Sequence, residues 1–401
     1  MTGVSRLLAA TGPNLAEHLA QFGEMRTATP ELIEVIDQSG LSGRGGAGFP
    51  TGRKMATITG SRTVVVGNGA EGEPLSSKDA TLLTTAPHLV LDGLDAAADA
   101  IGADKVYLYV HPDATDAIST ALEERRAAGR DAHRITVVAA PDRFVAGEES
   151  AAISRIEGGP ALPRDRTVVA AVSGVRGRPT LVNNVETLAN IALIARFGPD
   201  WFRTIGDPDD PGSMLVTLSG ALDGGVVEVP TGVPLADLLQ HPGGADLHRL
   251  RAVLIGGYHG TWLSPEEFAI ARLSRTALKP LGATPGAGII HALDYSECGL
   301  ARTAEIAQYL ADQSARQCGP CLNGLPRLAE LLEQLAFGRA SDDLVREIRR
   351  IVRLVDGRGA CRHPDGTARM VRSALHTFAD DIEWHRQGRC AASDVDHVHP
   401  R

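Results

Sequence analysis

The chain has 401 residues, of which 43% are hydrophobic and 22% are charged, and its formal net charge is −9 at pH 7. This composition is typical of a globular protein with two or three domains, and the negative charge argues against general nucleic-acid binding. No apolar run approaches the ~20 residues of a membrane span, and the N-terminus lacks the pattern of a signal peptide. We therefore expect a cytoplasmic protein without a membrane span.

The first half of the chain alternates short apolar runs with longer amphipathic segments. After a helical stretch at 14–38, strands are predicted at three runs rich in β-branched residues, 63–67, 105–110 and 135–140. Helices are predicted at 86–102, at 112–129, from 147–149 onward and from 183 to about 197. Strands that alternate with helices predict an α/β fold with a Rossmann-like, mostly parallel sheet, and such sheets bind ligands at the carboxyl ends of their strands.

The composition changes at residues 207–212, where Asp, Pro and Gly predominate. We expect a first domain at 1–206 and a small mixed sheet with one helix at 207–280. A third domain at 281–389 is expected to be a helical bundle, with helices at 299–317, 320–336, 341–356 and 366–385. The tail at 390–401 is expected to be disordered.

A glycine-rich loop precedes the first predicted strand, with the sequence GRGGAGFPTGRK at 43–54. Glycines let backbone N–H groups approach a ligand closely, and successive N–H groups form a concave nest that favours anions such as phosphate. Arg44 and Lys54 add positive charge at either end, and Phe49 adds an apolar plane. The pattern favours a cradle for the phosphate and ring of a nucleotide or flavin, although a plain surface turn has the same composition.

Four carboxylates follow predicted strands. Glu71 and Glu73 lie in the loop after the strand at 63–67, and Glu148 and Glu149 begin a helix after the third strand. Because the carboxyl ends of parallel strands share one edge of a sheet, we expect these side chains at a common site. They are suited to accept hydrogen bonds from ribityl or ribose hydroxyls or from a nicotinamide amide. For Glu148 and Glu149, stabilisation of the helix N-terminus is an alternative explanation.

The five cysteines lie in the last third of the chain, at Cys298, Cys318, Cys321, Cys361 and Cys390. An odd, clustered set is a poor disulfide framework and indicates metal or redox chemistry. The CxxC pair at 318–321, with Cys361, suits thiol redox chemistry, zinc or an iron–sulfur cluster, and buried unliganded thiols are a further alternative. Cys298 and Cys390 are interpreted as structural or exposed thiols rather than as ligands.

Five motifs together give the chain a family resemblance. They are the loop at 43–54, NGAEGEPLSSKD at 68–79, AGEESA at 146–151, RPTLVNNVETLAN at 178–190, and CGPC at 318–321 with Cys361. In order and approximate spacing they resemble the NADH-oxidising FMN and iron–sulfur subunit of respiratory complex I and its relatives in hydrogenases and formate dehydrogenases. The segment from 212 to about 270 resembles that family's soluble-ligand-binding β-grasp (SLBB) domain.

The resemblance implies an FMN site and a nicotinamide site. FMN contacts carry over to Gly43, Arg44, Gly45, Gly46, Lys54, Asn68, Glu71, Gly147, Glu148, Glu149, Asn183, Asn184 and Thr187. The nicotinamide site would involve Phe49, Glu73 and Glu149. No side chain is expected to act as a catalytic residue, because the family's flavin itself takes the hydride and passes electrons to a 4Fe-4S cluster.

The chain also departs from the family. The family's cluster motif has a further Cys at the position where this chain has Ala315. Only Cys318, Cys321 and Cys361 of this chain are therefore in register as ligands. A fourth ligand from His363, Cys298, Cys390, water or a partner is open, as are a 3Fe-4S core and a structural zinc ion at the three cysteines and His363. Aromatic residues that stack the NADH adenine appear here as Thr57 and Val169, and an FMN-contacting Asp as Ala70.

Two functions follow as hypotheses. The first is an NADH dehydrogenase-like oxidoreductase that moves electrons from NAD(P)H, or from a ferredoxin-like donor, through FMN to an iron–sulfur cluster and on to a redox partner subunit. The alternative is a non-catalytic scaffold or binding subunit of a redox complex with a degenerate cluster site. The absent Cys at position 315 motivates the alternative.

Overall fold

A computed structural model describes residues 5–392 except 131, 166–167 and 339. The chain divides into two compact units. The first unit comprises Met1–Thr217, Val226–Val233 and Gly286–Gly288, and the second comprises Leu218–Gly225, Pro234–Pro285 and Ile289–Arg401. The three-domain division expected from the sequence stays a prediction, and most of the tail expected to be disordered lies outside the described residues.

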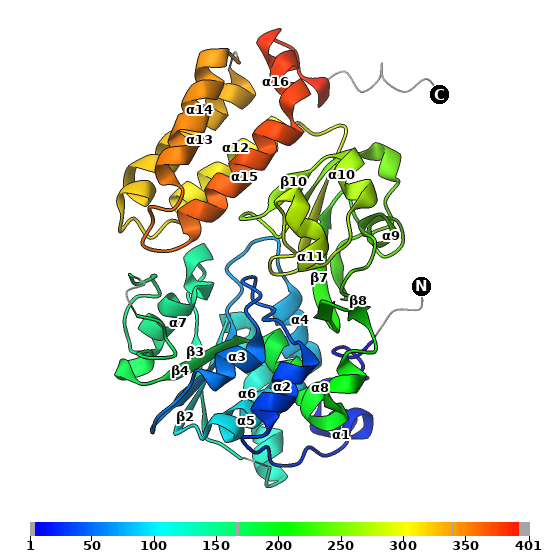
Figure 1. Ribbon diagram of the computed structural model, residues 1–401, viewed down its shortest axis with the longest axis vertical. Helices are drawn as coiled ribbons and strands as arrows, with labels where there is room; N and C mark the ends of the chain where they lie inside the picture. Colours follow the sequence, from blue (N-terminus) through cyan, green and yellow to red (C-terminus); the bar gives the residue numbers. More distant parts are fainter. Residues whose placement is uncertain (1–4, 131, 166–167, 339, 393–401) are drawn as a thin grey trace. The chain divides into compact units, whose positions relative to one another are not determined.

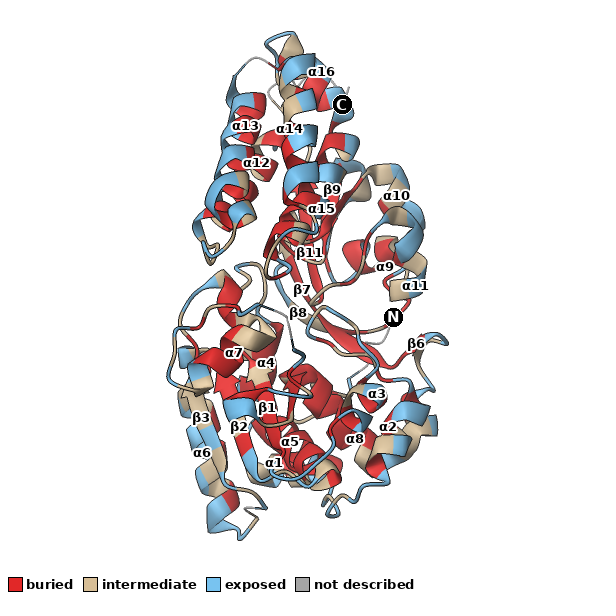
Figure 2. Cartoon of the chain, turned by 60° about the vertical axis from the view of Figure 1, so that its left-hand side comes forward, coloured by how far each residue is buried: buried red, intermediate tan, exposed pale blue. Residues whose placement is uncertain are grey.

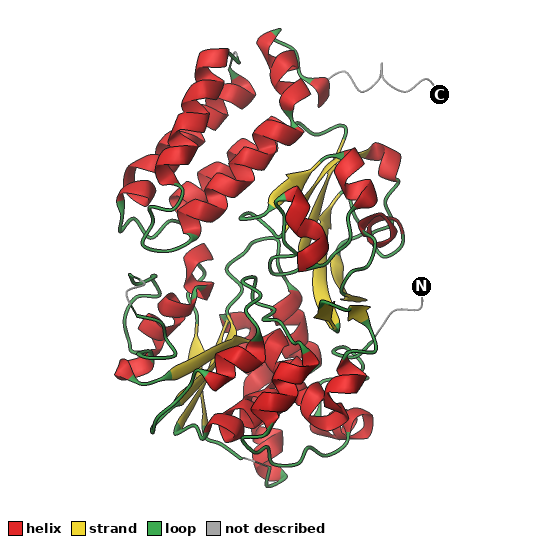
Figure 3. Ribbon diagram, viewed as in Figure 1, coloured by secondary structure: helices red, strands yellow, loops and turns green. Residues whose placement is uncertain are grey.

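A four-stranded parallel sheet forms the centre of the first unit (Figures 1 and 3). Its strands are β1 (Val64–Gly69), β2 (Lys105–Val110), β3 (Ile135–Ala139) and β4 (Thr180–Asn184), in the order β3-β2-β1-β4. The α/β fold expected from the sequence is confirmed. Val64, Val65 and Val66 of β1 are fully buried, as expected of a central parallel strand that is covered on both faces.

Helices cover both faces of this sheet. One face packs in a core that includes residues of α4 (Lys78–Thr85), α5 (Pro87–Ile101), α6 (Thr115–Ala127) and α8 (Val185–Phe202). The other face packs in a smaller core with α7 (Glu149–Ile156). Figure 2 shows how completely β1 and α5 are buried.

The close approach of α5 to α8 depends on Gly93. A Cβ atom there would lie 1.8 Å from the carbonyl oxygen of Leu188, which is far inside any allowed contact. The absence of a side chain at this position therefore lets the two helix backbones touch.

Several parts of the first unit differ from the sequence prediction, and the helix α4 was not predicted. The helical stretch expected at 14–38 is broken: α1 (Leu15–Phe22) ends at Gly23, whose φ is 71°, and α2 (Leu32–Ser39) follows after a non-helical connection. The strand β4 was not predicted, because its residues TLVNN end in two asparagines, which are depleted in strands. Pairing with β1, from Val64–Thr180 to Asn68–Asn184, supplies the order that the local sequence lacks.

A second sheet has the strand order β10-β9-β11-β7-β8. Its strands are β7 (Ser213–Gly220), β8 (Gly225–Pro230), β9 (Leu250–Ile255), β10 (Thr261–Leu263) and β11 (Ile289–Asp294). Short helices accompany it, at α9 (Leu235–Gln240), α10 (Pro265–Ile270) and α11 (Arg275–Leu278), and β5 (Gly206–Asp207) pairs separately with β6 (Asp210–Pro211). The strand β10 and the helix α10 were not predicted, and the β-grasp assignment stays a prediction.

The helical region of the second unit contains α12 (Gly299–Asp312), α13 (Leu325–Phe337), α14 (Asp342–Val355), α15 (His363–Thr377) and α16 (Ala379–Arg386). The last predicted helix is thus divided in two at Phe378. In α14, Val345, Ile348 and Val352 are buried at helical spacing, so that one apolar stripe faces the bundle. Within the described residues, none of the helices is long and apolar enough to cross a membrane.

Candidate functional site

A cavity of about 690 Å³ lies in the first unit, at the carboxyl ends of β1 and β4. Its wall contains Asn68 and Ala70 from the end of β1, and Asn183 and Asn184 from the end of β4. The strand order reverses between these two parallel strands, because β2 and β3 lie on one side of β1 and β4 lies on the other. Such a switch point is where open α/β sheets bind ligands, and the volume is typical of a small-molecule site.

The glycine-rich loop forms one wall of this cavity. A β-bridge between Ser42 and Pro50 closes the loop, and the N–H of Gly43 donates to the carbonyl of Phe49 at 2.9 Å. Gly46 and Gly48 have φ angles of 106° and 64°, a backbone conformation that disfavours other residues. Phe49 is 53% exposed in the wall. The loop thus offers backbone and one aromatic ring to a ligand.

Lys54 provides a cation in the same wall. It lies on α3 (Thr51–Ala56), which follows the loop directly. Its Nζ lies 3.0 Å from Glu149 Oε1 and 2.5 Å from the carbonyl oxygen of Val182. These two contacts hold the ammonium group between α7 and β4.

Glu71 stabilises the loop that follows β1. Its carboxylate accepts hydrogen bonds from the N–H groups of Asp79 and Ala80, both at 3.0 Å, and from the Ser76 hydroxyl. Burial, and then the nearby Asp79, raise the pKa of Glu71 above its usual value. The side chain therefore orders the start of α4, a structural role beside the ligand role that the family resemblance implies.

Lys78 is a fully buried lysine in the cavity wall, which the sequence analysis did not select. Its Nζ lies 2.6 Å from Asp79 Oδ1 and 2.9 Å from Glu186 Oε2, and it donates to Asn184 Oδ1 at 3.1 Å. Burial alone would lower its pKa, but Asp79 and then Glu186 outweigh that effect and raise the pKa above its usual value. The adjacent Lys and Asp after a glycine- and acid-rich loop were the available sequence signal.

The loops after β1 and β3 touch through glycines. A Cβ atom at Gly72 would lie 2.5 Å from the carbonyl oxygens of Arg143 and Phe144, and one at Gly147 would lie 2.7 Å from that of Ala70. Asn68 joins the same loops, since its Nδ2 donates to the carbonyl of Gly147 at 2.9 Å. These contacts place Glu71 and Glu73 in one cavity wall with Glu148 and Glu149, as expected from the sequence.

Glu148 acts as the N-cap of α7. Its carboxylate accepts hydrogen bonds from the N–H groups of Ser150 at 2.8 Å and Ala151 at 3.1 Å, and from the Ser150 hydroxyl. The helix-stabilising explanation considered for this residue is therefore realised in the structure. Glu149, by contrast, directs its carboxylate to Lys54.

The two asparagines at the end of β4 have different surroundings. Asn184 is saturated by the protein: its Oδ1 accepts from Glu186 N at 3.0 Å, and its Nδ2 donates to Asn68 O at 3.1 Å and Asp79 Oδ2 at 2.6 Å. Asn183 is 5% exposed, and its Nδ2 has no hydrogen-bond partner among the described residues. An unpaired buried amide costs about 1–3 kcal/mol, so a ligand with an acceptor group fits this position.

Most of the predicted cofactor residues line this one cavity: Gly43, Gly45, Phe49, Lys54, Asn68, Glu71, Glu73, Gly147, Glu148, Glu149, Asn183, Asn184 and Thr187. Arg44 and Gly46 are not in its wall. The guanidinium of Arg44 is buried against Ser42 Oγ at 3.1 Å, Asp210 Oδ1 at 3.4 Å and the Pro211 carbonyl at 3.1 Å. Arg44 therefore anchors the loop, and its backbone N–H donates to Thr187 Oγ1 at 2.9 Å.

Cys321 of the CxxC pair lies in a π-helical turn at Pro320–Gly324 that precedes α13, and Cys318 lies just before this turn. Cys321 and Cys361 are buried. Burial, and then the neighbouring Cys318 and Cys361, raise the pKa of the Cys321 thiol to about 12. These three cysteines do not form a compact group with ligand atoms within 4.8 Å of one another.

His363 is held by other groups. Its Nε2 lies 2.8 Å from the carbonyl oxygen of Leu310, and its Nδ1 lies 3.1 Å from Nε2 of His259. Because both ring nitrogens face protein partners, the structure does not favour His363 as the ligand that completes the set.

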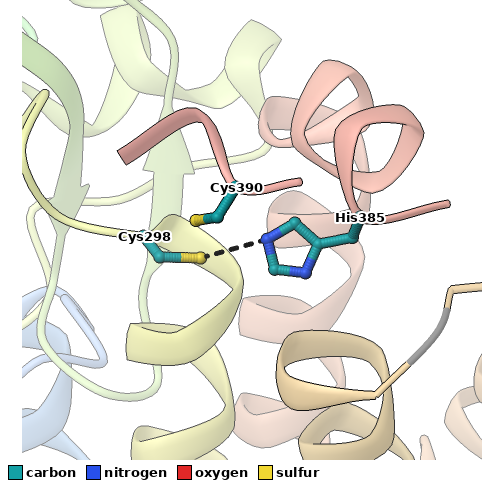
Figure 4. Close-up of side chains that lie close together, drawn as sticks. All are labelled: Cys298, His385 and Cys390. Carbon is teal, nitrogen blue, oxygen red and sulfur yellow. Dashed lines mark hydrogen bonds between the residues drawn. The ribbon is translucent and has the colours of Figure 1, made fainter. Parts of the chain in front are cut away.

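A different group of three ligand side chains is compact. The ligand atoms of Cys298, His385 and Cys390 all lie within 4.8 Å of one another (Figure 4). Burial, and then the neighbouring Cys390, raise the pKa of the Cys298 thiol to about 11. The hydrogen bond from the N–H group of Ala301 lowers the pKa, but burial outweighs it. From the sequence, both cysteines were interpreted as structural or exposed thiols, with each left open as a fourth ligand of the cluster, and their grouping with His385 was not predicted.

Comparison with protein families gives two matches. Residues 36–193 match the Nuo51 FMN-binding domain, and residues 301–385 match the iron–sulfur binding region of NADH-ubiquinone oxidoreductase-F. The first match contains the whole cavity wall apart from Ala287, and the second contains the CxxC pair and Cys361.

Individual relatives agree. The chain is 32% identical to the F subunit of NADH-quinone oxidoreductase from Streptomyces coelicolor, over 90% of this chain and 84% of the relative. It is 30% identical to the HndC subunit of the NADP-reducing hydrogenase from Solidesulfovibrio fructosivorans, over 91% of this chain and 78% of the relative.

Solved structures of an NAD⁺-reducing [NiFe]-hydrogenase also match. The H2-reduced state has a TM-score of 0.80 at 31% identity, over 89% of this chain and 62% of the hydrogenase chain. The air-oxidised state has a TM-score of 0.85 at 29% identity, over 100% of this chain and 72% of the hydrogenase chain. This chain thus spans less than two thirds of the chain in the first of these structures.

Proposed function

We propose a route for electrons through this chain from the premise that it belongs to the family of the NADH-quinone oxidoreductase F subunits. It is an NADH dehydrogenase-like electron-transfer flavoprotein with an FMN domain and an iron–sulfur region. In this proposal, NAD(P)H delivers electrons at the cavity of the first unit. They leave through a cluster on Cys318, Cys321 and Cys361 to a redox partner subunit.

The observation that carries the FMN site is the cavity at the β1–β4 switch point, with the Nδ2 of Asn183 lacking a partner among the described residues. Bound FMN supplies hydride acceptance and the release of single electrons. The N–H groups of the glycine loop and the ammonium of Lys54 would offset its phosphate charge. Asn183 would donate to an acceptor on the ligand.

The outer part of the same wall would receive the nicotinamide donor. Phe49 is 53% exposed, and Val168 and Val169 are 54% and 66% exposed, so that they present apolar surface beside the carboxylates. Glu73 and Glu149 would orient the carboxamide. Valine packs against an adenine ring less extensively than an aromatic side chain does, so we expect a modest affinity for the dinucleotide.

Cluster binding would use three cysteines of this chain. Ala315 cannot supply a fourth thiolate, and Cys298 and Cys390 lie in a separate group with His385. The cluster would therefore keep one iron that is not held by a cysteine of the described chain, which is an open position for water or for a group from a partner.

The relatives are subunits of multi-subunit redox complexes, so partner subunits belong to the proposal. A ferredoxin-like acceptor and a cytoplasmic location are the forms we propose. Matches to both the FMN and the iron–sulfur regions do not favour the non-catalytic scaffold.

An anaerobic titration tests the proposed function. The purified full chain is loaded with FMN, and NADH or NADPH is added while the flavin absorbance is recorded. We expect bleaching with at least one of the two nucleotides. A protein that fails to retain FMN would contradict the flavin site, and a retained flavin that stays oxidised with both nucleotides would contradict the donor.

A further inference from the structure

A compact set of soft ligands lies in the helical region, apart from the CxxC motif. Cys298 immediately precedes α12, His385 lies near the end of α16, and Cys390 follows that helix. Figure 4 shows the two sulfur atoms and the imidazole ring converging from these three segments. We propose that Cys298, His385 and Cys390 bind a zinc ion that is separate from the iron–sulfur cluster.

The distances fit a single ion. Nε2 of His385 lies 3.6 Å from Sγ of Cys298, and all three ligand atoms fall within 4.8 Å of one another. Tetrahedral zinc, with Zn–S of about 2.3 Å and Zn–N of about 2.0–2.1 Å, places its ligand atoms roughly 3.6–3.8 Å apart. Small side-chain movements are therefore sufficient to bring the three atoms to one ion.

The imidazole is already oriented as a ligand. Nδ1 of His385 lies 3.2 Å from the carbonyl oxygen of Leu335, which can only accept a hydrogen bond. The proton is therefore assigned to Nδ1, and Nε2 directs its lone pair toward Cys298. Metal-binding histidines characteristically donate their second ring N–H to a carbonyl or carboxylate, which fixes both the tautomer and the ring. His385 is 6% exposed, so this arrangement is packed in place.

The start of α12 places a backbone donor at the sulfur atom of Cys298. Cys298 is the N-cap of α12, and its Sγ accepts a hydrogen bond from the N–H of Ala301 at 3.5 Å. Negative charge at a helix N-terminus is stabilised by the helix dipole, and thiolates rather than thiols ligate metals. Cys298 and Cys390 are both partly exposed, so an ion from solvent can reach the site.

A zinc ion at this position would tie the segment that follows α16 to the start of α12. The three ligands connect the segment after α16 to the start of α12, which are far apart in sequence. Zinc has no redox chemistry, so the ion would hold structure and would not carry electrons. With three protein ligands, the fourth position is left for water or for a side chain of a partner.

Metal analysis of the full chain tests the proposal. After equilibration with zinc and removal of the excess, we expect about one zinc per chain in the wild type, and a decrease of ~10-fold or more in Cys390→Ser and His385→Asn. The asparagine keeps a donor toward Leu335 but lacks the Nε2 ligand atom. Both variants are expected to keep wild-type iron. Cys318→Ser is the matched control, since it should lower iron and keep zinc.

Several results would overturn the assignment. Zinc that is unchanged in Cys390→Ser, or zinc that is lost in Cys318→Ser but kept in His385→Asn, places the ion elsewhere. A quantitative disulfide between Cys298 and Cys390, detected by alkylation and mass measurement of the anaerobically purified chain, also overturns it. Circular dichroism of each variant establishes folding, and His376→Asn controls for histidine loss because the His376 side chain is 81% exposed.

Discussion

The flavin region and the cysteine region are assembled in different ways. Around the cavity, several polar side chains are held by other groups of the protein: Glu71 accepts hydrogen bonds at the start of α4, Glu148 caps α7, and Lys78 is neutralised by Asp79 and Glu186. In the helical region the candidate metal ligands of the described chain fall into two sets, and neither contains four ligands. The cavity is therefore shaped by contacts within the protein, whereas each proposed metal site offers three side chains and would be completed by water or by a partner group.

Lys78→Met is expected to have the largest effect, because it leaves two buried carboxylates without their cation. Removing one member of a buried ion network costs about 3–5 kcal/mol, and we expect a loss of this size in the free energy of unfolding, measured with urea and without FMN. Lys105→Met, at an exposed lysine of the same sheet, should change it by less than about 0.5 kcal/mol. Equal effects of the two changes would contradict a cavity held together by its buried charges.

Lys54→Ala should act on the cofactor more than on the fold. Its ammonium is a partly exposed cation in the cavity wall, with a side-chain exposure of 29%. Because charged hydrogen bonds contribute about 1.5–3 kcal/mol, FMN affinity should fall ~10- to 100-fold, measured by fluorescence titration. Lys54→Arg keeps the charge and should recover part of the affinity. If the alanine variant bound FMN as tightly as the wild type, Lys54 would not contact the flavin.

The asparagine pair gives a matched comparison within one strand end. Asn183→Ala should lower FMN affinity by about 1–2 kcal/mol and leave the free energy of unfolding of the apoprotein almost unchanged, because Nδ2 has no partner among the described residues to lose. Asn184→Ala should instead lower the free energy of unfolding, since it removes bonds to Glu186, Asn68 and Asp79. Calorimetry of both variants with and without FMN measures the contrast. A reversed pattern would show that the unpaired donor is not a ligand position.

Ala315→Cys should have the smallest effect. It would give the cluster region a complete set of protein ligands, so that this region, like the cavity, would be held by the protein alone. It restores a thiolate at the family position, so the cluster should lose iron to a chelator several-fold more slowly, on the order of 3- to 10-fold. Flavin content should stay the same. Optical spectra after addition of a chelator follow the loss, and an unchanged rate would mean that position 315 does not face the cluster.

Some elements and site residues could be predicted from the sequence, and others could not. The strands β1 to β3 were predictable because β-branched residues are enriched in strands, and the glycine-rich loop indicated a ligand site through its own composition. The direction of Arg44 was not predictable, because its partner Asp210 is 166 residues away in the chain. The group at Cys298, His385 and Cys390 was missed for the same reason, since its members are brought together only by the packing of α12 against α16.

Gly93 lies outside the cavity, but its contact with α8 links it to the proposed flavin site. The backbone contact between α5 and α8 places Leu188 directly behind Thr187, and the same helix begins at the two asparagines of β4. A methyl group at Gly93 must push α8 away and carry the rim of the cavity with it. Genetic screens for cofactor-deficient forms should therefore recover substitutions in the interior of α5, in proteins that still fold but release their flavin.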